Sequence, residues 1–405
     1  MPAGENNKIY LDYAATTPVD KEVLKAMMPY FSEKFGNASS VHSFGQEAIA
    51  AVDQAREKIA KYFNCNFAEI IFTGSATESN NLAIRGFVQK YNYTTSKRSS
   101  TSGTNRGHII STKIEHESVL EPLKELEKAG QEVTYLPVDK EGLIKISNLE
   151  KAIKDTTILI SIIYANNEIG TIQPIKEIGK LLEKINKKRK ENNLARIYFH
   201  TDAVQALNYL ECRPDWLKVD LLTFSGHKIY GPKGIGGLYV RKNTPLSPII
   251  SGGGQEFGLR SGTENISSII GLAKAVELAL ENKEKNYKKI FDLRNQLLKD
   301  IIKDNKIAVK INGLCNDCLP NILNIRFPGI NNETLIIALD QAGVAISAGS
   351  ACSSRASAAS HVLTAIGLTP KQVKESIRIS IGKNTTKQEI KKAIRIINKY
   401  EKLLI

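Results

Sequence analysis

The most informative segment of the chain reads Ser225-Gly226-His227-Lys228-Ile229-Tyr230-Gly231-Pro232-Lys233-Gly234. An apolar run ends at Phe224, and Gly and Pro interrupt the chain soon after Lys228. This order places an amine just past the end of a buried strand, at the edge where open α/β sheets bind their ligands. An amine in that position can form a Schiff base with an aldehyde cofactor. Most lysines at strand ends are simply solvated, so the interpretation depends on companion residues elsewhere in the chain.

Helical and strand-like segments alternate from about residue 40 to 240. Apolar side chains recur at helical spacing over residues 44–63, which predicts an amphipathic helix. Short apolar runs without polar alternation follow, and such runs are typical of strands buried on both faces. We therefore predict an α/β fold with a mostly parallel sheet between helices. The predicted strands are Glu69–Phe72, His108–Thr112, Val133–Leu136, Thr157–Ile163, Ile197–His200, Leu221–Phe224 and Gly237–Val240.

The pattern changes after about residue 264. A long helical pattern runs from Ile266 to about Leu298, and strand-like runs follow at Asn321–Arg326 and Ser376–Ile381. A final helical pattern covers residues 386–403. This part of the chain predicts a second, smaller α/β domain.

The composition excludes some classes of protein. The chain has 405 residues, of which 42% are apolar, so disorder over most of its length is excluded. With 56 basic and 42 acidic side chains, the formal net charge is +14, which raises the hypothesis of a nucleic-acid or membrane-surface partner. The basic residues are spread over predicted helix surfaces without interleaved aromatic residues, so we expect no direct contact with nucleic acid.

Targeting signals and disulfide patterns are also absent from the sequence. No apolar window is long enough to cross a membrane, and the first residues have no signal-like pattern, so we expect a cytoplasmic protein without membrane contact. Cys315 and Cys318 form one C-x-x-C pair without a second pair, so we predict no metal site. The five cysteines are odd in number and scattered, which argues against a secreted disulfide framework. They are Cys65, Cys212, Cys315, Cys318 and Cys352.

Three further segments can supply companions for Lys228. Asp202 follows a predicted strand and can keep a pyridinium nitrogen protonated, although a helix N-cap explains this residue equally well. Residues 74–78, Gly-Ser-Ala-Thr-Glu, open a predicted helix whose N–H groups suit a phosphate, although Gly-Ser turns are common. Cys352 lies in a run of small residues, 347–354, that has no apolar periodicity. A thiol in such a run suits a nucleophile that must reach two places.

Together these segments resemble the cysteine desulfurases of the NifS/IscS type. These are pyridoxal-phosphate enzymes of the class V aminotransferase family, with the type I aminotransferase fold. The resemblance extends over nearly the whole chain, and its motifs follow one another in the family's order. It implies a large cofactor-binding domain of residues 18–263, and a small domain of residues 1–17 and 264–405 that carries the cysteine loop. The matching segments, besides those around Asp202 and Lys228, are 10–18, 72–81, 166–170, 260–263, 347–352 and 376–380.

The resemblance implies catalytic and substrate-binding roles for five residues. Lys228 would hold the cofactor and then move the α-proton of the substrate. His116 would stack on the cofactor ring and act as an acid. The alternative interpretation is a histidine in a surface loop without a catalytic role. Arg378 would bind the substrate carboxylate, a task that suits a bidentate guanidinium, and Asn167 would approach the ring or the substrate. Cys352 would attack the substrate sulfur.

The resemblance also implies the remaining contacts of pyridoxal 5'-phosphate. Asp202 would face the pyridine nitrogen, and Gln205 would face the phenolic oxygen. Thr263 would reach the phosphate across a subunit interface, so a homodimer is implied. The other residues expected at the phosphate are Ala76, Thr77, Ser225 and His227.

The implied reaction converts L-cysteine to L-alanine. A persulfide on Cys352 would pass the sulfur to an acceptor protein, such as an iron–sulfur scaffold, for cluster assembly or tRNA thiolation. Alternatives on the same scaffold are a selenocysteine lyase or an aminotransferase, and a basic nucleic-acid-binding protein is an alternative from another class. The positive charge suits the steering of an acidic sulfur acceptor. Residues 92–106 look longer than usual for the family, and no role is assigned to them.

Overall fold

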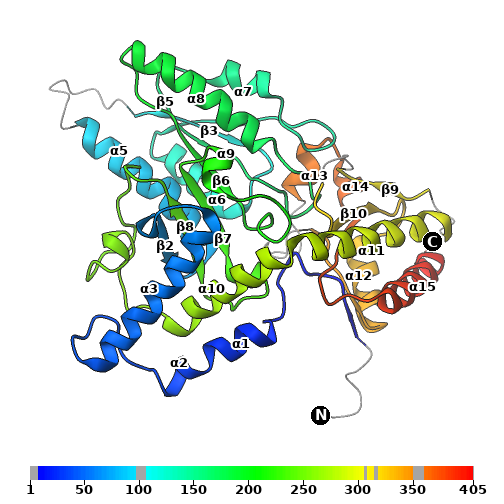
Figure 1. The fold of residues 1–405 in the computed structure, drawn as a ribbon. Helices are drawn as coiled ribbons and strands as arrows, with labels where there is room; N and C mark the ends of the chain where they lie inside the picture. The colour runs from blue at the N-terminus through cyan, green and yellow to red at the C-terminus, as the bar shows by residue number, and fades with distance from the viewer. Residues whose placement is uncertain (1–7, 97–105, 305–307, 314–317, 350–359, 405) are drawn as a thin grey trace.

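The computed structural model describes residues 8–96, 106–304, 308–313, 318–349 and 360–404. Its main feature is a seven-stranded sheet that lies among helices on the left of Figure 1. Strand β8 runs antiparallel to both of its neighbours, and the other adjacent pairs are parallel, so the predicted mostly parallel sheet is confirmed. In spatial order the strands are β2 (Ile70–Thr73), β8 (Gly236–Val240), β7 (Leu221–Ser225), β6 (Tyr198–Asp202), β5 (Thr157–Ser161), β3 (His108–Thr112) and β4 (Glu132–Leu136).

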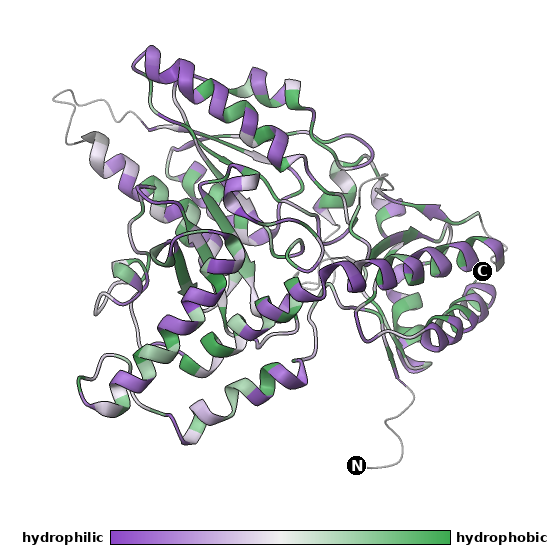
Figure 2. Ribbon diagram, viewed as in Figure 1, coloured by the Kyte–Doolittle hydropathy of each residue, from purple (hydrophilic) through white to green (hydrophobic). Residues whose placement is uncertain are grey.

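Both faces of this sheet are buried. Ile71 of β2 belongs to a core with α5 (Phe87–Ser96) and α6 (Glu117–Lys128). The next residue, Phe72, belongs to a core with α3 (Ser43–Phe63) and α10 (Ile266–Glu281). Successive side chains therefore enter opposite cores, which explains why the strands read as continuous apolar runs. Figure 2 shows the apolar strands enclosed by helices with hydrophilic outer faces.

Further helices complete the large unit. A π-helical turn, Leu82–Gly86, joins α4 to α5. The other helices are α1 (Lys21–Met27), α2 (Pro29–Ser32), α4 (Ala76–Asn81), α7 (Ile146–Ala152), α8 (Ile175–Glu191) and α9 (Pro214–Leu217).

The smaller unit on the right of Figure 1 is built on a three-stranded antiparallel sheet. Its strands, in spatial order, are β12 (Ser376–Ser380), β10 (Ile322–Arg326) and β9 (Lys310–Ile311). The beginning of the chain joins this unit, because β1 (Ile9–Tyr10) pairs in parallel with β11 (Val344–Ala345). The helices are α11 (Lys283–Asp304), α12 (Asn332–Gln341), α13 (His361–Ala365), α14 (Pro370–Val373) and α15 (Lys387–Leu404).

The single helix expected from Ile266 to about Leu298 is two helices. α10 ends at Glu281 and α11 begins at Lys283, with Asn282 between them at φ −104° and ψ 9°. The Asn282 amide donates to the carbonyl of Leu278, which caps the end of α10. An Asn side chain competes with the helix for backbone hydrogen bonds, and apolar periodicity alone does not register that competition.

None of the helices in the described part of the chain carries an apolar stretch that is long enough to cross a membrane.

Candidate active site

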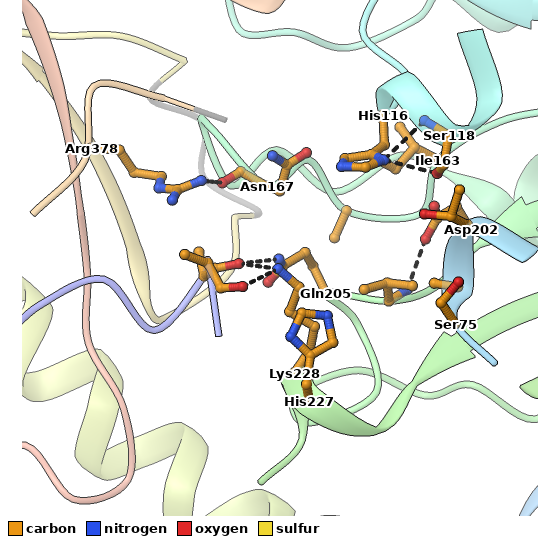
Figure 3. A pocket seen from close by; sticks show the side chains of 16 residues that line it. Ser75, His116, Ser118, Ile163, Asn167, Asp202, Gln205, His227, Lys228 and Arg378 are labelled. Atoms are coloured by element: carbon orange, nitrogen blue, oxygen red, sulfur yellow. Dashed lines mark hydrogen bonds between the residues drawn. The ribbon is translucent and has the colours of Figure 1, made fainter. Parts of the chain in front are cut away.

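A pocket lies where β6 and β7 end. It brings together nine of the residues predicted for the site, and Figure 3 shows their side chains from close by. These nine are Ala76, Thr77, His116, Asn167, Asp202, Gln205, His227, Lys228 and Arg378. The pocket is also lined by Ala14, Ala15, Ser75, Ser118, Ile163, Ala165 and Val204. Ser225 is buried at the end of β7 and is not among the lining residues.

Lys228 ends a single 3₁₀ turn that begins directly after β7. The turn is tight, because a Cβ on Gly226 would lie 2.8 Å from the carbonyl oxygen of Pro232. The Nζ of Lys228 donates to the carbonyl oxygens of Ala14 and Ala15, at 2.6 and 2.7 Å. Gln205 Nε2 donates to the same Ala14 oxygen at 3.0 Å. The N-terminal segment therefore holds the amine at the floor of the pocket.

Asp202 is the last residue of β6 and is 4% exposed. Its Oδ1 accepts the backbone N–H of Val204 at 3.0 Å, and its Oδ2 accepts Asn80 Nδ2 at 2.7 Å. Each carboxylate oxygen thus has a donor, which stabilises a negative charge in a buried place. A carboxylate held in this way suits a protonated pyridine nitrogen.

His227 precedes Lys228 and lines the same pocket. Its Nδ1 lies 3.2 Å from the Thr16 hydroxyl. Burial, with a smaller contribution from the charge of Lys228, lowers the pKa of His227 from 6.5 to about 4. The ring is therefore neutral at physiological pH, so it does not add a cation beside the amine.

The start of α4 forms another wall of the pocket. Ser75 is the N-cap, and its hydroxyl accepts the N–H of Glu78 at 3.1 Å. A Cβ on Gly236 of β8 would lie 2.6 Å from the Ser75 carbonyl carbon, so this close approach requires glycine. Ala76 and Thr77 are thereby fixed as the first helical residues, where N–H groups point outward and suit a phosphate.

Thr263 lies in a different hollow. That hollow is also lined by Gly74 and Arg260. Arg260 Nε donates to Glu78 Oε1 at 3.0 Å, and Glu78 Oε2 accepts the N–H of Gly74 at 2.8 Å. The segment that carries Thr263 is therefore tied to the start of α4, but Thr263 does not line the pocket that holds Lys228.

Arg378 comes from β12 of the smaller unit and is 1% exposed. Nη1 donates to the carbonyl oxygen of Asn167 at 2.9 Å, and Nη2 donates to Asp12 Oδ1 at 2.8 Å. Its buried Nε makes no hydrogen bond within the described structure. A buried donor without an acceptor is costly, so a carboxylate that enters the pocket would find a guanidinium ready to receive it.

Cys352 lies outside the described residues, as does Cys315. The described residues on either side of that segment are anchored beside the pocket. Ser347 and Arg378 exchange backbone hydrogen bonds, and the Ser360 hydroxyl donates to Glu168 Oε2 at 2.6 Å. Ser347 and Ser360 therefore lie near residues that line the pocket or adjoin it in the sequence.

Several site residues were not identified from the sequence. Asp12 is 366 positions from Arg378, so no local spacing could reveal their pairing. Ala14, Ala15 and Asn80 lie inside the motifs that carry the resemblance, and position within a motif was their only signal. Ser118 lies two residues after His116, where a helix N-cap pattern provides a weak signal.

No group of three or more metal-ligating side chains occurs among the residues that the structure describes. Cys65 and Cys212 are free thiols there. Burial raises the pKa of Cys65 to about 12, so this thiol is a poor nucleophile.

The pocket fits pyridoxal phosphate in the chemistry of its donors. It holds an amine for the aldehyde, a stabilised carboxylate for the ring nitrogen and a helix start for the phosphate. Arg378 lines the same pocket and can offer its guanidinium to a substrate carboxylate.

Comparison with known proteins agrees with this chemistry. A model of the aminotransferase class-V family matches residues 9–393. A protein from Dictyoglomus turgidum named cysteine desulfurase IscS is 46% identical over 393 residues, which cover 97% of this chain and 94% of that protein. A solved structure titled NifS-like protein superposes with a TM-score of 0.88 at 37% identity, covering 98% of this chain and 100% of the other. A structure titled "SspA in complex with cysteine" gives a TM-score of 0.76 at 38% identity, covering 93% and 99%.

Proposed function

The chain belongs to the class V aminotransferase family, and we propose that it uses pyridoxal phosphate to convert L-cysteine to L-alanine as a cysteine desulfurase. The observation that carries the proposal is the pocket that unites Lys228, Asp202 and Arg378 from distant parts of the chain. Bound pyridoxal phosphate supplies an aldehyde for an amine and a ring that withdraws electrons from the substrate α-carbon. The protein supplies the orientation and the proton transfers.

Each residue has a separate task in this proposal. Arg378 receives the substrate carboxylate through the guanidinium that lines the pocket. Lys228 Nζ moves the α-proton, and the carbonyls of Ala14 and Ala15, to which it donates, hold the amine inside the pocket. His116 stacks over the ring and acts as an acid. Asp202 keeps a proton on the ring nitrogen.

Sulfur transfer is assigned to Cys352. Its thiolate would attack the substrate sulfur, so that an S–S bond forms while the substrate Cβ–S bond breaks. The electron pair of the broken bond would stay with the carbon fragment, which takes up a proton to become alanine, and the persulfide would pass its outer sulfur to an acceptor protein, such as an iron–sulfur scaffold. Ser347 and Ser360, described residues that flank Cys352 in the sequence, support this assignment, because Ser347 is hydrogen-bonded to Arg378 and Ser360 to Glu168. The formal charge of +14 favours an acidic acceptor, whose binding would weaken as salt is added.

We further propose a cytoplasmic homodimer. A second copy would cover large apolar side chains that are exposed on α1, α2 and the start of α3, along the lower left edge of Figure 1. It would also bring its Thr263 to the phosphate end of the pocket. The exposed residues are Leu24, Met28, Phe31, Phe35 and Phe44. The proposed domains remain residues 18–263, and residues 1–17 with 264–405.

The cysteine assignment has a direct test. Cys352→Ser should abolish alanine formation from L-cysteine and leave the cofactor absorbance of the purified protein unchanged, because the hydroxyl is a far weaker nucleophile than a thiolate. Cys65→Ser is the matched control and should retain activity. Unchanged turnover in Cys352→Ser would overturn the sulfur-transfer assignment and would favour an aminotransferase.

A further inference from the structure

His116 caps the helix that follows it. It is the N-cap residue of α6, and its Nδ1 accepts the backbone N–H of Ser118 at 3.1 Å. A backbone N–H can only donate, so Nδ1 must present a lone pair. In a neutral imidazole the proton then resides on Nε2. Figure 3 shows Nδ1 turned toward Ser118, which leaves the Nε2 edge of the ring directed away from this helix.

The hydrogen bonds behind His116 have only one consistent direction. Asn80 is fully buried, and its Nδ2 lies 2.7 Å from Asp202 Oδ2 and 2.8 Å from Ser118 Oγ. The ionised carboxylate only accepts, so the amide nitrogen, not the amide oxygen, must face Asp202. Its second hydrogen then points to the Ser118 hydroxyl. That hydroxyl therefore donates its own proton to His116 Nδ1, at 2.8 Å.

We propose that Asn80 and Ser118 are positioning residues that fix the tautomer of His116. The chain of hydrogen bonds has an acceptor at each end: Asp202 beside the ring nitrogen and Nδ1 of His116. Two donors from Ser118 converge on Nδ1, so the neutral ring presents Nε2–H to the pocket and no acceptor. The Nε2–H of His116 can then donate a hydrogen bond but cannot take a proton at that edge, which leaves Lys228 as the base.

This inference rests on the proposed function, because it concerns the acid assigned there. It adds that Asp202, which would keep the ring nitrogen protonated, and His116, the proposed acid, belong to one chain of hydrogen bonds. Asn80 does not contact His116, yet its replacement should change the hydrogen bonding at His116 Nδ1. Without the amide donor, nothing fixes the direction of the Ser118 hydroxyl, and its proton is free to turn away from Nδ1.

The test reads the ring nitrogens directly. The full-length protein with bound pyridoxal phosphate is labelled with ¹⁵N-histidine, and two-bond proton–nitrogen correlations identify the protonated nitrogen of each ring. His116→Gln assigns the signals among the six histidines of the chain. We expect His116 to be protonated at Nε2 and bare at Nδ1. A proton on Nδ1 of the neutral ring would overturn the proposal.

Variants test the two positioning residues. Ser118→Ala and Asn80→Leu should both shift the Nδ1 resonance in the same direction, because each removes the hydroxyl proton from Nδ1. Ser118→Thr keeps a hydroxyl and should restore the parent resonance. Each of the two should also lower kcat by about 10-fold, a fraction of what an acid contributes. Ser111→Ala is the matched control, since this buried hydroxyl has no hydrogen bond within the described structure.

The outcomes separate this inference from the proposed function. The positioning role would be overturned if the His116 Nδ1 resonance in Ser118→Ala and Asn80→Leu were the same as in the Ser111→Ala control. Full turnover in His116→Gln would instead refute the acid role, and the tautomer read by resonance would still stand.

Discussion

Two buried arginines in different regions of the molecule show how one side chain serves either the fold or the pocket. Arg56 of α3 is 4% exposed, and its two terminal nitrogens each bind an oxygen of Glu256 at 2.7 Å. Three aromatic rings surround it, with centroids 4.6 to 5.5 Å from its Cζ. Arg378 is as deeply buried, but it binds only one oxygen of Asp12 and lines the pocket.

The difference lies in what surrounds each guanidinium, because the Nε of both arginines makes no hydrogen bond within the described structure. Both oxygens of Glu256 are used by Arg56, and one of them also accepts the N–H of Phe72 at 2.8 Å. This closed arrangement holds Glu256 at φ +50° and Phe257 at φ +56°, two non-glycine residues in the left-handed region. Arg378 donates to one oxygen of Asp12 and to the carbonyl of Asn167, and it lines a cavity. A guanidinium enclosed by aromatic rings and a fully bound carboxylate indicates a structural arginine, and one that lines a cavity and binds its carboxylate through a single oxygen indicates a binding arginine.

The largest effect is expected at the structural arginine. Arg56→Met should lower the free energy of unfolding by about 3–5 kcal/mol, because it leaves the Glu256 carboxylate buried without its cation. The measurement is urea unfolding followed by circular dichroism. Lys124→Met breaks an exposed pair with Glu121 and should cost under about 0.5 kcal/mol. If Arg56→Met lost no more unfolding free energy than this control, Arg56 would not be a structural arginine and the contrast with Arg378 would fail.

The next effect concerns activity. Arg378→Lys keeps a cation for Asp12 but removes the planar fork that suits a carboxylate, so kcat/KM for L-cysteine should fall about 100-fold, or ~2.7 kcal/mol. Steady-state alanine formation measures it. Arg326→Lys, on the neighbouring strand β10, is the matched control and should leave KM unchanged. An unaltered KM in Arg378→Lys would show that substrate binding rests elsewhere.

The third effect depends on pH and comes from a buried acid that is not paired with an arginine. Glu115 is fully buried, with one oxygen bonded to Thr112 and to the N–H of Ile163 and the other unpaired. Burial raises its pKa from 4.5 to about 8. The unfolded chain therefore loses this proton first as the pH rises. The folded protein should lose stability between about pH 4.5 and 8, by up to ~1.4 kcal/mol per pH unit.

Glu115→Gln isolates that contribution, because glutamine has the same shape and does not titrate. The difference in unfolding free energy between Glu115→Gln and the parent protein should grow in favour of the variant from pH 5 to 8. Glu121→Gln, at an exposed position, should show no such trend. A constant difference across this range would mean that Glu115 is ionised in the folded protein, in contrast to the present interpretation.

Much of the fold could be predicted from local patterns. The strands of the large sheet are apolar without alternation because both faces are covered, and that signal lies within five residues of chain. Lys228 and Asp202 were recognisable because polar residues directly after such strands meet at one edge. The break at Asn282 was missed because helical periodicity continues on both sides of it.

The unpredicted contacts join residues that are far apart in the chain. Arg378 donates to Asp12, Lys228 donates to the carbonyl of Ala14, and Asn80 donates to Asp202. Separations of this size leave no periodic trace, because the folded backbone and not the local chain brings the partners together. Resemblance to a family marked several of these residues as members of motifs, but it did not indicate what they touch.

Order along the chain therefore specified the class of fold, the edge of the sheet that carries the site, and the residue types suited to pyridoxal phosphate. Those properties follow from local polarity, since a strand buries apolar residues and ends where polar ones begin. Three-dimensional packing decided the partners of Arg378 and the neutrality of Glu115. It also decided the direction of every hydrogen bond from Asp202 to His116. These features depend on which groups are excluded from water together, and burial is a property of the whole fold.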